Sequence, residues 1–82
     1  MLDLNDLRVF ERVADLRSFS AAARALGLPK STVSRSVARL EDALAARLLQ
    51  RTTREVQLTA AGEVLRENAR KCSDGLARLS NL

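Results

Sequence analysis

The sequence predicts a small, mainly α-helical domain with one short β-hairpin, followed by a long helix. Two helical patterns between residues 18 and 44 are joined by a short turn that contains Gly27. At 55–58, polar and apolar residues alternate, which is the period of a β-strand. From 59 to about 79, apolar residues recur at helical spacing. The length of 82 residues is enough for one small domain.

The first predicted helix begins at Asn5 or Asp6 and ends near Asp15. Asn5 is expected to cap the helix, and Asp6 suits the positive end of the helix dipole. One face carries three apolar residues at helical spacing: Leu7, Phe10 and Ala14. Val9 and Val13 lie on another side, which predicts a second contact surface.

A second helix is predicted to start after Ser18, a good N-cap residue, and to end at Leu26. Gly27 follows as the expected left-handed residue that closes the helix. The third helix begins between Pro29 and Ser31, because proline is tolerated in a first helical turn.

The third helix has two contrasting faces. Its apolar stripe consists of Val33, Val37, Leu40 and Leu44. The opposite face consists of Ser31, Arg35, Ala38 and Asp42, with Thr32 and Arg39 beside it. Two helices joined by a glycine-containing turn, the second with a polar and basic outer face, are typical of a helix-turn-helix that inserts into a DNA groove.

The charge distribution supports the same interpretation. Residues 1–16 carry a net charge of −2, residues 17–54 carry +6, and residues 55–82 are balanced. The positive charge thus coincides with the helix-turn-helix and the segment after it. A concentrated basic patch suits phosphate binding.

Residues 47–58 predict a hairpin with a polar tip at 51–54. Arg54 at this tip is expected to reach a narrow minor groove. Arg39 and Arg51 are either phosphate contacts or structural residues. Ser20 lies near a helix start, where hydroxyl and backbone N–H groups can bind phosphate or simply cap the helix.

The last helix is predicted to start at Thr59, its cap, and to carry a heptad-like seam. The seam residues are Leu65, Ala69, Cys72, Leu76 and Leu79. So long a seam cannot fold entirely onto a domain of this size, so part of it is expected to pair with a second copy. Val9 or Val13 is expected to contact the partner's helix. Cys72 is interpreted as a small buried hydrophobe.

Composition argues against several other functions. Histidine is absent, and no metal-ligand spacing or glycine-rich phosphate loop is present, so we expect no enzyme, metal or cofactor. No apolar run reaches 18 residues, and a single cysteine excludes an internal disulfide, so we expect a cytoplasmic protein. The alternative is a helical dimerisation or protein-interaction module without DNA affinity. It explains the seam but not the basic patch.

An ordered set of short motifs resembles the N-terminal domain of LysR-type bacterial transcriptional regulators, and the similarity covers essentially the whole chain. The matching segments are residues 7–10, 18–23, 26–28, 31–35, 40–41, 48–49, 51–54 and 58–62. The resemblance implies a winged helix-turn-helix at 1–58 and a linker helix at 59–82. In the family this helix pairs two subunits and leads to an effector-binding domain, which is absent here.

The resemblance also implies which residues bind DNA. The family's base-reading positions fall on Lys30, Ser31, Thr32, Ser34 and Arg35, and its minor-groove residue falls on Arg54. The implied partner is double-stranded DNA with an interrupted inverted repeat. The family often has Gln where this chain has Lys30 and Ser36, so the bases read are expected to differ.

Overall fold

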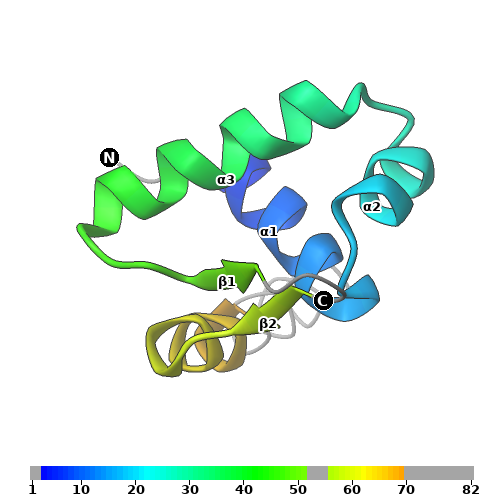
Figure 1. Cartoon of the computed structure of the whole chain (residues 1–82). Helices are drawn as coiled ribbons and strands as arrows, with labels where there is room; N and C mark the ends of the chain where they lie inside the picture. Colours follow the sequence, from blue (N-terminus) through cyan, green and yellow to red (C-terminus); the bar gives the residue numbers. More distant parts are fainter. Residues whose placement is uncertain (1–2, 52–55, 70–82) are drawn as a thin grey trace, which may run out of the picture.

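The computed structural model describes residues 3–51 and 56–69, and shows three helices packed above a two-stranded hairpin (Figure 1). Helix α1 spans Leu4–Leu16. The Asp3 carboxylate caps it by accepting a hydrogen bond from the Asn5 N–H at 2.8 Å. The predicted cap at Asn5 is therefore wrong by two residues: Asn5 lies inside the first turn of α1, and its own N–H is the group that Asp3 caps.

Helix α2, Phe19–Leu26, has the predicted bounds. Ser18 Oγ accepts a hydrogen bond from the Ala21 N–H at 3.1 Å, and Gly27 has φ of 67°. Both predicted caps are confirmed. The left-handed backbone at Gly27 turns the chain toward the next helix.

Helix α3, Lys30–Leu44, begins inside the predicted window. Pro29 stands at the N-cap, one residue before the turn where we expected it. Val33, Val37 and Leu40 are buried as predicted, but Leu44 is 37% exposed. The buried stripe therefore ends one turn earlier than its periodicity indicates.

The hairpin consists of β1, Leu49–Arg51, and β2, Val56–Leu58. The strands are antiparallel, with Gln50 opposite Gln57. This confirms the predicted hairpin within 47–58. Residues 52–55, including Arg54, lie outside the described residues.

The core joins all these elements. Its buried members are Val9, Phe10, Val13, Phe19, Ala22, Ala23, Val33, Val37, Leu40, Leu48 and Leu49. Val9 is 5% exposed and Val13 is fully buried within their own domain, which leaves little surface for the expected contact of Val9 or Val13 with a partner's helix. Because both α2 and α3 pack against α1, its buried face is wider than the predicted face of Leu7, Phe10 and Ala14, and the two valines belong to it.

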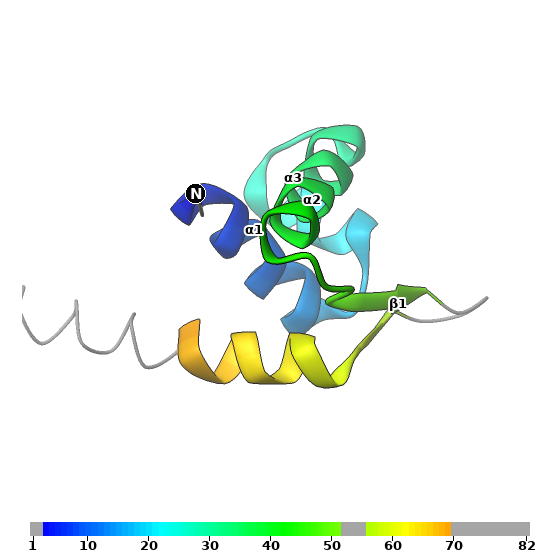
Figure 2. The same cartoon turned by 90° about the vertical axis from the view of Figure 1, so that its left-hand side faces the viewer.

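Residues 60–69 are helical, and Figure 2 shows this helix beneath α1, on the side away from α3. Thr59 Oγ1 accepts a hydrogen bond from the Gly62 N–H at 3.1 Å, which confirms the predicted cap. Leu65 packs against the core and Ala69 is 3% exposed. The first part of the predicted seam thus faces its own domain, which leaves Ala69 little surface for a partner. Cys72, Leu76 and Leu79 lie outside the described residues.

None of the helices in the described part of the chain is both long and apolar enough to cross a membrane.

Candidate nucleic-acid interface

The outer face of α3 has the polar and basic character that the sequence predicts. Lys30, Ser31 and Arg35 are exposed, and Thr32 and Ser34 are half-buried at its flanks. The buried stripe of α3 lies on the opposite side, so these five side chains are held outward by packing that does not involve them. They occupy the first two turns of the helix, the part that a recognition helix presents to base edges.

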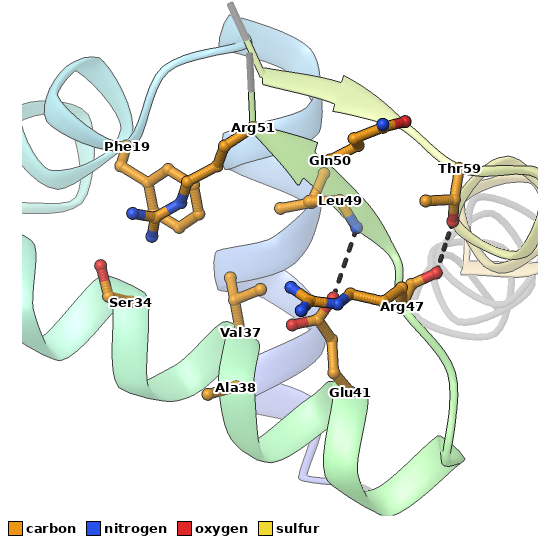
Figure 3. A pocket seen from close by; sticks show the side chains of 10 residues that line it. All are labelled: Phe19, Ser34, Val37, Ala38, Glu41, Arg47, Leu49, Gln50, Arg51 and Thr59. Carbon is orange, nitrogen blue, oxygen red and sulfur yellow. Dashed lines mark hydrogen bonds between the residues drawn. The ribbon is translucent and has the colours of Figure 1, made fainter. Parts of the chain in front are cut away.

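A groove of about 670 Å³ separates α3 from β1 (Figure 3). Ser34, Ala38 and Glu41 come from the α3 side, and Gln50 and Arg51 from the strand. The remaining lining residues are Phe19, Val37, Arg47, Leu49 and Thr59. The structure therefore brings two predicted site residues, Ser34 and Arg51, to the same groove from segments far apart in sequence.

Glu41 fixes the relation between the two walls of this groove. Its carboxylate accepts hydrogen bonds from the Leu48 N–H at 2.8 Å and the Leu49 N–H at 3.4 Å. These backbone groups stand where the chain enters β1. One α3 side chain thus sets where the strand begins, and thereby the width of the groove. The sequence alone does not reveal this role, since an acid near the end of a helix pattern gives no sign of what lies opposite it.

Arg51 is held by an aromatic ring. Its guanidinium carbon lies 4.2 Å from the centroid of the Phe19 ring. Cations are attracted to the negative face of an aromatic ring. The sequence left Arg51 as either a phosphate contact or a structural residue, and the structure gives it a specific internal contact while leaving its side chain exposed.

Arg39 is tied to α1. Its Nε and Nη2 donate hydrogen bonds to the Asp6 carboxylate at 3.1 and 2.9 Å, and Nη2 also donates to Ser36 Oγ at 3.3 Å. The Arg39 hydrogen bond lowers the pKa of Asp6, whose side chain is buried, below its ordinary value. The sequence left Arg39 as either a phosphate contact or a structural residue, and this contact gives it a structural role. For Asp6 the sequence predicted only a favourable interaction with the helix dipole.

Ser20 is exposed in the first turn of α2. Ser18, and not Ser20, caps this helix, so the Ser20 hydroxyl is left at the surface.

A family model described as bacterial regulatory helix-turn-helix proteins of the lysR family matches residues 4–63. The chain belongs to the LysR family. The match covers the three helices, the hairpin and the start of the helix after it, which are the elements that build the surface described above.

Curated relatives agree with this membership. An HTH-type transcriptional regulator of Xanthomonas campestris is 55% identical over 69 residues, which are 84% of this chain and 20% of that protein. A probable HTH-type transcriptional regulator, LtrA, of Klebsiella pneumoniae is 48% identical over 68 residues, 83% of this chain and 22% of that protein. The chain thus spans about a fifth of the length of these relatives.

Solved structures of the LysR fold match over nearly the whole chain. The BenM DNA-binding domain in complex with catB site 1 DNA superimposes with a TM-score of 0.90 at 30% identity, covering 96% of this chain and 88% of that one. The CbnR DNA-binding domain in its DNA complex gives 0.89 at 32% identity, covering 96% and 91%. Both similar domains were crystallised with DNA.

Proposed function

We propose that this chain is the DNA-binding part of a bacterial LysR-type transcriptional regulator, and that it binds double-stranded DNA in a sequence-specific manner. The observation that carries this proposal is the outward face of α3. Its first turns expose Lys30, Ser31 and Arg35, while its other side is buried in the core. Exposed donors on a rigid helix are what recognition in a major groove requires.

We propose the following roles for the individual side chains. Arg35 and Lys30 donate to guanine O6 and N7, for which an Arg fork is well suited. The hydroxyls that flank them contact bases or phosphates: Ser31, Thr32 and Ser34. Ser20 and Arg51 bind the sugar-phosphate backbone, which fixes the register without reading sequence. Arg54 enters the minor groove, where the potential of a narrow A·T tract is most negative.

We propose further that residues 1–58 contact DNA and residues 59–82 pair two copies. Leu65 and Ala69 pack on their own domain, so the partner contact falls to Cys72, Leu76 and Leu79. A two-fold dimer binds an interrupted inverted repeat. The domain acts by binding alone, in the bacterial cytoplasm where the DNA is, and any small-molecule effector binds another part of the regulator.

The test of DNA binding is fluorescence anisotropy on an operator duplex and on a scrambled duplex across a range of salt concentrations. We expect log affinity to fall linearly with log salt, by about 0.9 for each phosphate neutralised, and the operator to bind more tightly. If the affinity for DNA does not change with salt concentration, or if the chain binds neither duplex, the result would instead support an interaction module without DNA affinity.

Sedimentation tests the dimer separately. The wild-type chain is expected to form dimers, and Leu76→Lys is expected to give monomers that bind DNA more weakly, because burying one Leu is worth roughly 2 kcal/mol. A wild-type chain that stays monomeric at high concentration contradicts this part of the proposal.

A further inference from the structure

The contact between Phe19 and Arg51 joins two elements that both border the groove. Phe19 is the first residue of α2 and Arg51 is the last residue of β1. Phe19 is only 7% exposed and belongs to the core, so the surrounding helices fix the position of its ring. Figure 3 shows the guanidinium in front of this ring. The fixed ring therefore restricts the rotamers of the long, exposed Arg51 side chain that stacks on it.

The charges at the groove favour an anion. Arg47 and Arg51 both line it, and the two ion pairs among the described residues, Arg39–Asp6 and Arg66–Asp15, use neither of them. Glu41 is the one acid among the described lining residues. Its carboxylate already accepts two backbone hydrogen bonds at the start of β1. The two arginines and one glutamate give the described lining of the groove a net positive charge.

The second wall supplies a neutral donor. Ser34 comes from α3 and lines the same groove as Arg51, so its hydroxyl and the guanidinium border one space (Figure 3). A hydroxyl and a guanidinium on opposite walls suit an oxyanion with several acceptor oxygens, such as a phosphodiester.

We propose that Phe19 is a positioning residue for DNA binding. It holds the Arg51 guanidinium over the groove, where Arg51 and the Ser34 hydroxyl bind one phosphate of the DNA backbone. This inference rests on the proposed DNA-binding function. Because phosphates carry no sequence information, the contact contributes affinity for any duplex and does not select the operator.

The first test separates charge from stacking at Arg51. Arg51→Gln removes the charge, so the slope of log affinity against log salt on a random-sequence duplex is expected to become shallower by about 0.9. Arg51→Lys keeps the charge but loses the planar stack, and is expected to weaken binding about three-fold to five-fold. Arg47→Lys is the matched control, because Arg47 lines the same groove without a ring beneath it, and should change affinity less than about two-fold.

The second test addresses the ring itself. Phe19→Tyr keeps an aromatic face and is expected to bind as tightly as the wild type. Phe19→Leu is expected to lose as much affinity as Arg51→Lys, and the double variant no more than either single one, because both changes remove the same contact. Thermal melting checks that the variants fold. Should Phe19→Leu unfold, Arg51→Lys still tests the proposal, since it leaves the core untouched.

Wild-type affinity in Arg51→Lys, or an unchanged salt slope in Arg51→Gln, would overturn the inference while leaving DNA binding in place. Additive losses of affinity in the double variant would also overturn the inference. The two changes would then act independently, and the ring would affect binding only through the stability of the fold. If the wild-type chain binds no duplex at any salt concentration, the proposed function itself has failed.

Discussion

Asp6 of α1 and Arg39 of α3 connect the two helices through a pair of hydrogen bonds between one carboxylate and one guanidinium. The Asp6 side chain is buried, whereas that of Arg39 is 61% exposed. The carboxylate has therefore lost its water and depends on this partner and on Ser36 beside it. The connection orients α3, because it joins the middle of that helix to the first turn of α1.

This pair predicts a dependence of stability on pH. Arg39 holds the pKa of Asp6 below its ordinary value of 3.8. A group whose pKa is lower in the folded state stabilises the fold above its unfolded pKa and loses that contribution as the pH falls through the folded value. At pH values below about 4, the melting temperature is therefore expected to decrease as Asp6 becomes protonated.

Asp6→Asn should remove this acid dependence and lower stability at neutral pH by about 1 kcal/mol, because a charged hydrogen bond is lost. Melting curves from pH 2 to pH 7 measure both effects. Asp42→Asn, which changes an exposed carboxylate on the same α3, should leave the acid limb as in the wild type. The role of Asp6 is wrong if its variant and the wild type lose stability in parallel on acidification.

Gly62 makes a second close contact that the sequence did not reveal. A Cβ atom at this position would lie 2.1 Å from the Leu48 carbonyl oxygen. That oxygen also accepts the Thr59 N–H at 3.0 Å, so it cannot move away freely. The absence of a side chain lets the helix at 60–69 lie directly against the start of the hairpin.

Gly62→Ala is therefore expected to destabilise the chain by about 1–3 kcal/mol through steric overlap. Helix propensity alone predicts the opposite, a gain of about 1 kcal/mol. Chemical denaturation decides the sign. Ala61→Ser, at an exposed neighbouring position, should stay within about 0.5 kcal/mol of the wild type.

The capping residues Ser18 and Gly27 were enough to predict the bounds of α2, Pro29 the start of α3, and the strand period the hairpin. Such local signals failed where a residue acts across the fold. The spacing of Leu44 fits the apolar stripe, yet this residue is 37% exposed. Val9 and Val13 look like a second surface on a helical wheel and are part of one wide buried face. Glu41, Asp6 and Gly62 act on partners that only the packed structure identifies.

Replacing Ala45 with glycine is expected to raise the stability of the chain. Ala45 ends α3 with φ of 51°, a left-handed conformation that costs a residue with a Cβ roughly 1–2 kcal/mol. Glycine adopts it without strain but loses more entropy on folding, so Ala45→Gly should stabilise the chain by about 0.5–1 kcal/mol. Ala43→Gly, two residues earlier inside the helix, should destabilise it by about 1 kcal/mol. A lower melting temperature for both variants would contradict this account of the α3 terminus.

The last prediction separates base reading from phosphate binding on α3. Arg35 is exposed and is not among the buried residues of α3, so Arg35→Ala should leave the melting temperature nearly unchanged. If Arg35 donates two hydrogen bonds to one guanine, the variant should lose about 1–3 kcal/mol of binding free energy on the operator and much less on a scrambled duplex. Anisotropy titrations at one fixed salt concentration measure the difference. Arg12→Ala, which removes an exposed Arg from α1, is the control for charge alone. Equal losses on both duplexes for Arg35→Ala would make Arg35 a phosphate contact, and the assignment of α3 as the base-reading helix would then rest on Lys30 and the hydroxyls beside it.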